Sequence, residues 1–335
     1  MMFTFDDVLI KPTFSYINSR KDVSLHTTVN QDLELNIPII SANMDSITGP
    51  MMARTMRALG GIGCLHRFCS IEENIAMFQD SRFGLVSIGI GSKELERAAA
   101  LYSAGASYMV VDVAHGAQMS VVEHVNKLNE MFGDNIKIIV GNFATGESIK
   151  TFKSLLRNRN ATNTFKVGIG PGSACTTRTT TGVGVPQLSA IIDCVSSGEN
   201  IIADGGCRTP GDVAKALGAG AKAVMLGGML AGTDETPGEI IHNITGGTMK
   251  KYRGSASKES YAAQGKDEAW RTAEGESFLV PSKGGVADII LEITGGIRSA
   301  MTYTNSMTLK QFHENCTFIE ITNSTVNENG AHGNK

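Results

Sequence analysis

Short apolar, β-branched runs alternate with amphipathic stretches along most of this chain. Eight of these runs are typical of buried strands: 37–42, 61–66, 85–90, 108–113, 136–141, 165–170, 200–204 and 223–227. Seven stretches between them place apolar residues at helical spacing: 49–59, 71–79, 93–104, 117–131, 146–156, 187–196 and 210–218. Strands and helices that alternate in this way over short connections predict an α/β protein, a (β/α)₈ TIM barrel.

Capping residues support several of these helices. Ser70 is followed three residues later by Glu73, and Thr209 with Pro210 opens the helix before Ala214. A doubly wound sheet is the alternative, but it normally has fewer strands and carries its glycine fingerprint after the first strand. In this chain the glycines cluster late, which favours the barrel.

The stretch from 166 to 187 departs from the regular alternation. Phe165, Val167 and Ile169 alternate as in a strand, and a glycine-rich loop with a lone cysteine, Cys175, follows. Glycine permits positive φ and close approach of a ligand to the backbone. A single cysteine is most often an inert, buried apolar residue. The hydroxyl groups and glycines around Cys175 instead indicate a candidate nucleophile in a binding loop.

Two glycine pairs follow the last two predicted strands. Asp204 precedes Gly205 and Gly206, and Gly227 is followed by Gly228. In a TIM barrel, phosphate commonly binds at these strand ends, where backbone N–H groups and a helix N-terminus face the ligand. Asp204 can accept from ribose hydroxyls, although its alternative role is to cap the next turn.

Composition limits the class of partner. The chain has 335 residues, a formal net charge of -3 and 38 glycines without a fixed period. It therefore offers no basic footprint for nucleic acid or an anionic membrane, and we expect a small-molecule partner. Six cysteines without metal-binding spacing indicate a reducing compartment. The acidic start and the lack of a long apolar run predict a soluble, cytoplasmic protein.

Several motifs together resemble the IMP dehydrogenase/GMP reductase family. They are TFDDVL at 4–9, ANMD at 42–45, GGIG at 60–63, GIGPGSACTTR at 168–178, ADGG at 203–206, MLGGMLAG at 225–232 and GGIRS at 295–299. The resemblance covers roughly residues 3–322, the expected catalytic domain. It implies a (β/α)₈ barrel, a homotetramer, and a cysteine, here Cys175, that attacks C2 of a purine nucleotide.

The family runs two reactions, and the resemblance to GMP reductase is the stronger one. IMP dehydrogenase oxidises IMP with NAD, uses an Arg-Tyr pair in a mobile flap, and usually carries CBS domains inserted after strand 2. In this chain a normal connection follows strand 2. The flap candidate, 252–281, contains no Arg-Tyr in that order. The resemblance therefore implies reduction of GMP to IMP and ammonia with NADPH.

The family motifs assign catalytic and substrate-binding residues. Cys175, Thr177 and Glu274 match the catalytic positions, with Glu274 helping to protonate the departing amine. The run 271–275 matches the reductase's Arg-x-x-Glu-Gly. The remaining residues expected to bind substrate are Asp204, Gly205, Gly206, Gly227, Gly228, Gly254, Ser255, Ala256, Arg271, Thr272, Ala273 and Gly275.

The same resemblance implies a cofactor site and a cation site. Ser19 and Arg20 match a pair that reaches a neighbouring subunit's cofactor. The other residues expected to contact NADPH are Arg67, Asp112, Val113, Ala114, Ile169, Gly170, Ser299, Ala300, Met301 and Thr302. Carbonyl groups of Gly170, Gly172, Cys175 and Arg178 are expected to hold a potassium ion.

Some positions depart from the reductase pattern. Arg67 stands in place of the usual lysine, Ser255 and Ala256 replace Met-Ser, and His115 together with 232–239 is closer to the dehydrogenase. An IMP dehydrogenase without CBS domains and a non-catalytic nucleotide-binding barrel therefore remain alternatives. The polar tail, 323–335, has no periodicity, and we expect it to be disordered.

Overall fold

A computed structural model describes the chain except for residues 31, 243–245, 264–271, 323–324 and 326–335. Eight parallel strands close into a barrel, with β11 pairing back onto β4. They are β4 (Ile39–Ser41), β5 (Ile62–Leu65), β6 (Leu85–Ile88), β7 (Tyr108–Asp112), β8 (Lys137–Phe143), β9 (Thr162–Val167), β10 (Asn200–Asp204) and β11 (Ala223–Leu226). All eight overlap the apolar runs that predicted them, which confirms the (β/α)₈ fold.

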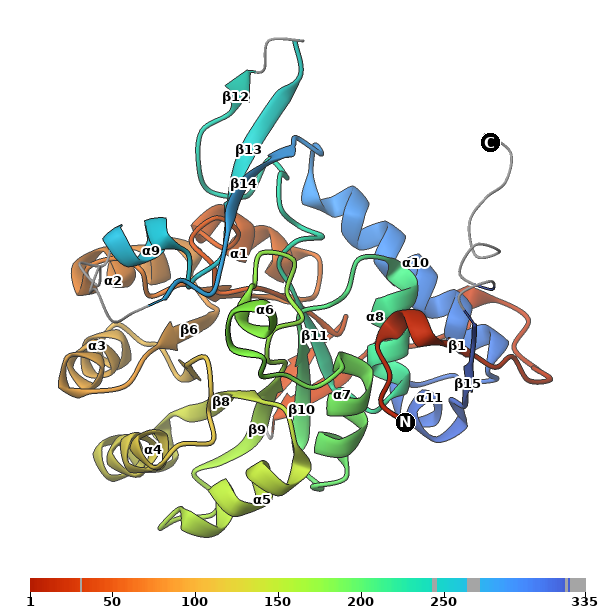
Figure 1. The fold of residues 1–335 in the computed structure, drawn as a ribbon, viewed down its shortest axis with the longest axis horizontal. Helices are drawn as coiled ribbons and strands as arrows, with labels where there is room; N and C mark the ends of the chain where they lie inside the picture. Colours follow the sequence, from red (N-terminus) through yellow and green to blue (C-terminus); the bar gives the residue numbers. More distant parts are fainter. Residues whose placement is uncertain (31, 243–245, 264–271, 323–324, 326–335) are drawn as a thin grey trace.

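Helices surround the barrel, as Figure 1 shows. The seven predicted helices are α1 (Pro50–Ala58), α2 (Ile71–Ser81), α3 (Ser92–Ser103), α4 (Met119–Phe132), α5 (Gly146–Leu155), α7 (Gln187–Val195) and α8 (Pro210–Gly218). Ser70 and Thr209 both close capping boxes, with Glu73 and Asp212. Only α2 joins β5 to β6, so the expected lack of an inserted domain at this point is confirmed.

The sequence reasoning missed the helix that completes the ring. Helix α10 (Val286–Tyr303) buries Val286, Ile290, Ile293, Ile297 and Met301 and packs beside α8. Shorter helical segments are η1 (Phe5–Asp7), η2 (Arg20–Asp22), η3 (Gly133–Asn135), α6 (Thr177–Thr181), α9 (Lys258–Ala263) and α11 (Leu309–Asn315). A spacing of three and four residues between the buried positions of α10 was the signal available for it.

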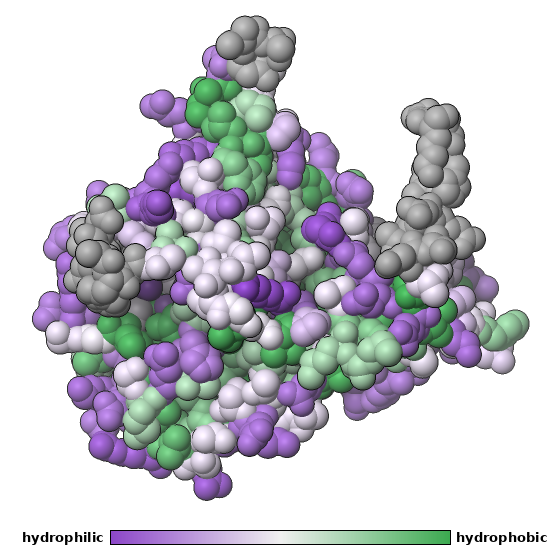
Figure 2. Space-filling view, in the orientation of Figure 1, coloured by the Kyte–Doolittle hydropathy of each residue, from purple (hydrophilic) through white to green (hydrophobic). Residues whose placement is uncertain are grey.

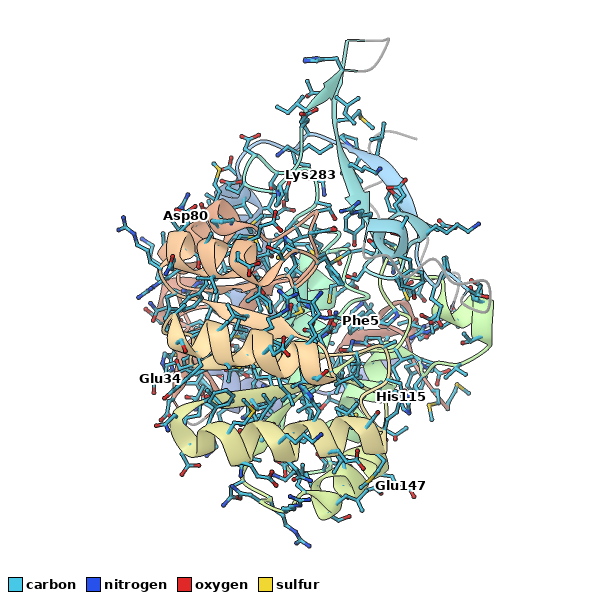
Figure 3. All side chains as sticks on the ribbon, turned by 90° about the vertical axis from the view of Figure 1, so that its left-hand side faces the viewer. Phe5, Glu34, Asp80, His115, Glu147 and Lys283 are labelled. Atoms are coloured by element: carbon cyan, nitrogen blue, oxygen red, sulfur yellow. The ribbon has the colours of Figure 1, made fainter. Side chains whose placement is uncertain are left out.

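Three small sheets lie outside the barrel. They pair β1 (Val8–Ile10) with β15 (Phe318–Glu320), β2 (Thr27–Asn30) with β3 (Leu33–Leu35), and β12 (Ile241–His242), β13 (Thr248–Arg253) and β14 (Ser277–Pro281) with one another. Figure 3 shows Glu34 of β3 at the opposite end of the barrel from Phe5 and His115. Phe5 lines a cavity with Asp204, the last residue of β10, and Gly227, which follows β11, so it lies at the carboxyl ends of the strands, where barrel enzymes build their active sites.

The β12–β14 sheet projects from the body of the molecule (Figure 1). Figure 2 shows a green, apolar area on this projection, and Ile240, Ile241, Phe278 and Leu279 are exposed there. The described residues include no helix that is long and apolar enough to cross a membrane.

Alternation along β9 places side chains on two different faces. Phe165 points outward and packs edge-to-face against Phe143 and Phe152, with ring centroids 5.2 and 6.0 Å away. Lys166 consequently points into the barrel, where it is 2% exposed. The strand was expected to reach residue 170 but ends at Val167, because Gly168 and Gly170 adopt φ of 151° and 79°.

Candidate active site

The glycines after β9 turn the chain across the end of the barrel. A Cβ on Gly168 would lie 2.0 Å from the carbonyl oxygen of Asp204, and a Cβ on Gly170 would lie 2.5 Å from the side chain of Arg178. Arg178 Nε and Nη2 donate to the carbonyls of Ile169 and Val185. The loop is therefore held tightly and carries Cys175 to the mouth of the barrel.

Cys175, Thr177 and Glu274 form one hydrogen-bonded chain. Cys175 Sγ lies 3.1 Å from Thr177 Oγ1, and Thr177 Oγ1 donates to Glu274 Oε2 at 2.8 Å. A hydroxyl has a single proton, so when it is donated to the carboxylate, the thiol is the donor to Thr177. The arrangement provides a path for a proton between the sulfur and the carboxylate.

Backbone hydrogen bonds bring Glu274 to the cysteine loop. Thr176 N donates to the carbonyl of Glu274 at 2.8 Å, and Glu276 N donates to the carbonyl of Ala174 at 2.9 Å. Gly254 N in turn donates to the carbonyl of Glu276, and a Cβ on Gly254 would lie 2.6 Å from the Ala174 carbonyl. The end of the predicted flap thus pairs directly with the loop that holds Cys175, and the start of the flap pairs with its end.

Two adjoining cavities open at this end of the barrel. One, of about 410 Å³, is lined by Cys175, Thr177 and Glu274. The other, of about 430 Å³, is lined by the two glycine pairs. Both are lined by Ala42, Met44, Pro171, Gly172, Asp204, Gly205 and Tyr252. The two cavities therefore adjoin, with the glycine pairs on the wall of one and Cys175 on the wall of the other.

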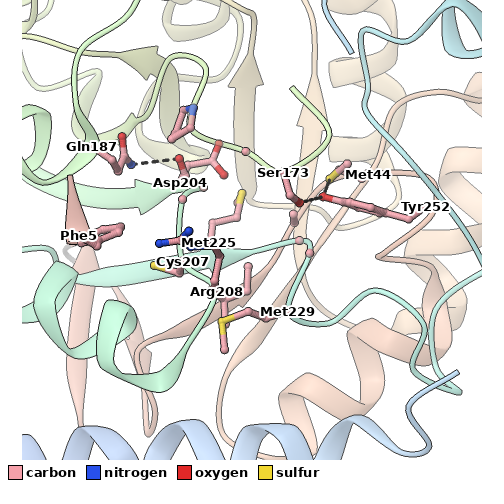
Figure 4. Close-up of a pocket in the computed structure, with 18 of the residues that line it drawn as sticks. Phe5, Met44, Ser173, Gln187, Asp204, Cys207, Arg208, Met225, Met229 and Tyr252 are labelled. Atoms are coloured by element: carbon pink, nitrogen blue, oxygen red, sulfur yellow. Dashed lines mark hydrogen bonds between the residues drawn. The ribbon is translucent and has the colours of Figure 1, made fainter. Parts of the chain in front are cut away.

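The glycine pairs give the second cavity its polar wall. Gly205 and Gly206 have φ of 85° and 87°, and a Cβ on Gly228 would lie 2.6 Å from Ser173 Oγ. Figure 4 shows Phe5, Cys207 and Arg208 around this cavity, with Gln187 hydrogen bonded to Asp204. Because larger residues would block the turns, these backbone N–H groups can approach an anion closely.

Asp204 and Asp112 share one buried lysine. Lys166 Nζ lies 2.8 Å from Asp112 Oδ1 and 2.6 Å from Asp204 Oδ2, and Asn142 Nδ2 also donates to Asp204 Oδ2 at 2.9 Å. Burial alone would lower the pKa of Lys166, but the two carboxylates raise it above its ordinary value. Burial would likewise raise the pKa of Asp112, but Lys166 and Arg67 hold it below its usual range.

The residues expected to contact the cofactor lie in two separate regions of the structure. Arg67, Asp112, Val113, Ala114, Ile169 and Gly170 all line the cavity that contains Cys175. Arg67 Nη2 donates to the Asp112 carbonyl at 3.4 Å, and its guanidinium lies 5.1 Å from the ring centroid of Phe68. The planar guanidinium of Arg67 and the ring of Phe68 can support a nicotinamide ring and its amide.

The other expected cofactor residues gather at η2 and the end of α10. Arg20 Nη2 donates to Tyr303 Oη at 3.5 Å, and Arg298 Nη1 donates to the carbonyl of Arg20. The described residues that line the two cavities do not include Ser19, Arg20, Ser299, Ala300, Met301 or Thr302. Met301 is fully buried, so its side chain packs in the core.

The remaining expected substrate residues lie on the flap. Gly254, Ser255, Ala256 and Gly275 line the Cys175 cavity, whereas Thr272 is exposed and Ala273 is half-buried. Arg271 lies outside the described residues. The isolated bridge between Cys175 and Gly275 shows why glycine stands at 275, since a Cβ there would meet the Ala174 carbonyl at 3.1 Å.

The loop carbonyls expected to hold potassium are partly engaged. The carbonyl of Gly172 accepts from Cys175 N, and that of Arg178 accepts from Gly182 N, both at 3.0 Å. Each carbonyl oxygen keeps a second lone pair, and carbonyl oxygens are the ligands that potassium takes. Within the described part of the chain, no group of three or more His, Cys, Asp or Glu side chains is placed to hold a metal ion.

Three residues that line the cavities were missed from the sequence. Lys166 and Asn142 bind Asp204, and Tyr252 is 3% exposed with Ser173 Oγ donating to its hydroxyl at 3.4 Å. Figure 4 shows Tyr252 between Ser173 and Met44. The signal for Lys166 was a charged residue at the inward position of a strand whose neighbours, Phe165 and Val167, are apolar.

Comparisons with known proteins agree with this geometry. The model of the family described as IMP dehydrogenase / GMP reductase domain matches residues 2–332. The chain is 38% identical to GMP reductase 1 of Mus musculus over 95% of this chain and 94% of the relative. It is 34% identical to the inosine-5'-monophosphate dehydrogenase of Cryptosporidium parvum over 98% of this chain and 94% of the relative.

Solved structures resemble the whole chain as well. A cysteine-to-alanine variant of GMP reductase from Trypanosoma brucei, in complex with guanosine 5'-monophosphate, matches with a TM-score of 0.90, 28% identity, and 99% and 98% of the two chains covered. An inosine 5' monophosphate dehydrogenase from Legionella pneumophila matches with a TM-score of 0.87, 41% identity, and 97% and 99% covered. Both activities thus occur among the relatives, and the site has to distinguish them.

Proposed function

This chain belongs to the IMP dehydrogenase/GMP reductase family of oxidoreductases, and we propose that it is a GMP reductase that converts GMP and NADPH to IMP, ammonia and NADP⁺. The observation that carries the proposal is the Cys175–Thr177–Glu274 hydrogen-bonded chain. Glu274 lies in the Arg-x-x-Glu-Gly motif, and no Arg-Tyr pair stands in the flap. The site therefore holds an acid for a departing amine.

Each of the two cavities binds a different part of the nucleotide. The phosphate binds the backbone N–H groups of the glycine pairs, Gly205-Gly206 and Gly227-Gly228. The ribose hydroxyls bind the free oxygen of Asp204, whose other oxygen is held by Lys166 and Asn142. The purine then lies in the Cys175 cavity with C2 beside the sulfur, between the loop and Gly254, Ser255 and Ala256 of the flap.

The first half of the reaction removes the amine. A proton passes from Cys175 through Thr177 to Glu274, which leaves a thiolate and a protonated carboxyl group. The thiolate adds to C2 of GMP, and Glu274 gives its proton to the 2-amino group through Thr177. Ammonia departs, and the purine remains bound to Cys175 as a covalent thioimidate.

The second half reduces C2. NADPH supplies a hydride to this carbon when its nicotinamide is bound, and the C2–S bond then breaks to give IMP and the thiolate. Arg67, Asp112, Val113, Ala114, Ile169 and Gly170 line the wall of the cavity beside Cys175, which fits a nicotinamide there. Carbonyls of Gly170, Gly172, Cys175 and Arg178 would hold a potassium ion that orders the cysteine loop.

We further propose a cytoplasmic homotetramer. Six free thiols fit a reducing compartment. Ser19, Arg20, Ser299, Ala300, Met301 and Thr302 lie apart from the cavities of their own subunit, so in an assembly they would complete the cofactor site of a neighbour. Placing the adenosine end of NADPH there makes each site depend on two subunits.

A second candidate is an IMP dehydrogenase without CBS domains, in which XMP is the product. It is favoured by the 41% identity to the Legionella pneumophila structure. The non-catalytic alternative has less support, because Cys175, Thr177 and Glu274 line one cavity and are hydrogen bonded in series.

Nicotinamide absorbance separates these candidates. We expect GMP with NADPH to give steady loss of the reduced-cofactor band and release of ammonia. IMP with NAD should give no sustained turnover, since the flap supplies no Arg-Tyr pair for hydrolysis. Sustained NADH formation from IMP would instead identify a dehydrogenase, and silence in both assays would favour the non-catalytic barrel.

Arg67→Lys tests whether the proposed cofactor subsite needs the planar shape of arginine or only its positive charge. Lysine keeps the charge but cannot both donate to the Asp112 carbonyl and lie flat over Phe68. We expect most activity to remain, with a rise of about 2- to 10-fold in KM for NADPH, as for the loss of one hydrogen bond of about 1 kcal/mol. Steady-state kinetics with varied NADPH measure it.

Arg54→Lys is the matched control, because Arg54 is exposed on α1 and pairs with Asp80. It should leave KM unchanged. An Arg67→Lys variant that turns over faster than the parent would show that the arginine is not adapted to this step and that the family's usual lysine serves it better.

A further inference from the structure

Lys166 lines the cavity that contains Cys175 and binds Asp204, which lines both cavities. It is 2% exposed on β9, and its two partners come from strands on either side of it: Asp112 from β7 and Asp204 from β10. The distances from Nζ to the two carboxylates are 2.8 and 2.6 Å. One ammonium therefore binds a carboxylate on the nicotinamide side and another on the ribose side.

Lys166 is the cation that contacts both the Asp112 and the Asp204 carboxylates. Arg67 acts on Asp112 from the loop after β5, and Asn43 and Asn142 supply neutral hydrogen bonds. Burial raises the pKa of the nearby groups Cys64, Tyr252 and Cys207, so they stay neutral in the physiological range. Without Lys166 the buried cluster would hold two like charges in a small volume.

We propose that Lys166 is a positioning residue shared by the two subsites: its ammonium fixes Asp112 for the cofactor and Asp204 for the nucleotide, so that binding at both subsites depends on one cation. The assignment of the carboxylates to their ligands rests on the proposed function. The site itself rests on the two contacts and on the position of the three side chains, which all line the Cys175 cavity, with Asp204 also lining the other cavity.

Lys166→Met tests the proposal, because methionine has similar length but neither charge nor hydrogen bonds. Calorimetric titrations with IMP and with NADP⁺ at pH 6 and pH 8.5 give the readout. We expect both affinities to fall by about 10- to 100-fold, the range for a misplaced binding group. The loss should be smaller at pH 6 than at pH 8.5, because without the ammonium the two neighbouring carboxylates repel each other and lower pH relieves that repulsion.

Two further variants separate positioning from folding. Lys166→Met with Asp112→Asn removes one charge of each sign and with it the repulsion between the carboxylates. IMP binding should therefore lose its pH dependence and recover in part, while NADP⁺ binding stays weak. Lys153→Met is the matched control. Lys153 is a partly buried lysine that pairs with Glu199 at 3.1 Å, and it lies outside both cavities. It should lower thermal stability and leave both affinities unchanged.

Several results would overturn the shared role. A loss confined to one ligand would assign Lys166 to a single subsite, and equal losses at both pH values would make it a structural residue. A double variant that binds both ligands like the parent would also contradict it. IMP takes part in either family reaction, so this titration holds if the chain proves to be a dehydrogenase; turnover of the parent with GMP and NADPH tests the reductase separately.

Discussion

Cys175→Ala should abolish turnover while nucleotide binding stays within about tenfold of the parent. In the proposed mechanism the sulfur bonds to C2, and removing a nucleophile of this kind lowers kcat by roughly 10⁴-fold or more. The glycine pairs and Asp204, which we propose bind the phosphate and the ribose, line the neighbouring cavity. Binding of GMP, measured by calorimetry, should therefore survive when NADPH oxidation is lost.

Cys316→Ala is the control for loss of a thiol. Cys316 is half-buried after α11 and packs near Gly218, away from both cavities. It should keep full activity. Substantial NADPH oxidation by the Cys175→Ala variant would rule out a covalent mechanism, and loss of GMP binding would mean that the cysteine loop also forms part of the binding site.

Glu274→Gln should separate the two halves of the reaction. Glutamine keeps the shape of the carboxyl group and can still bind Thr177, but it delivers no proton to the amine. Deamination should slow by about 10²–10⁴-fold, the range for a general acid. Steady-state reduction of GMP measures this loss.

Hydride transfer should suffer less in the same variant. In the proposed mechanism IMP with NADP⁺ and no ammonia requires only thiolate addition and hydride removal. A single-turnover burst of NADPH should therefore persist when an added buffer base takes the thiol proton in place of Glu274. Glu276→Gln is the control, since its side chain is exposed two residues away. Equal loss of burst and deamination would make Glu274 a binding or folding residue, and normal rates in both directions would make it a surface charge.

Local physics was enough to predict the barrel. A strand buried on both faces must be apolar over a few residues, and a helix that covers it must be apolar at every third and fourth residue, so both signals lie within short windows of sequence. The eight strands and seven helices follow this rule. Helix α10 obeys it too and was missed because it follows the long polar flap rather than a barrel strand.

The loop chemistry was also visible in the sequence. Glycines at 168, 170, 205 and 206 mark positive φ or close backbone approach, and the structure has both at these positions. The family resemblance added Thr177 and Glu274, and the comparisons confirm the family. Which residue binds which ligand stays a prediction.

Only the tertiary structure decided which chemical groups meet. Glu274 lies 97 residues after Thr177, and it reaches this hydroxyl because backbone pairing lays the flap's end along the Cys175 loop. Lys166 meets Asp112 and Asp204 because the three strands end at the same rim of a closed barrel. Short-range sequence patterns report which way a side chain points relative to its own strand or helix. The partner on the other side of a cavity depends on ring closure and on backbone hydrogen bonds between distant segments, which no local window contains.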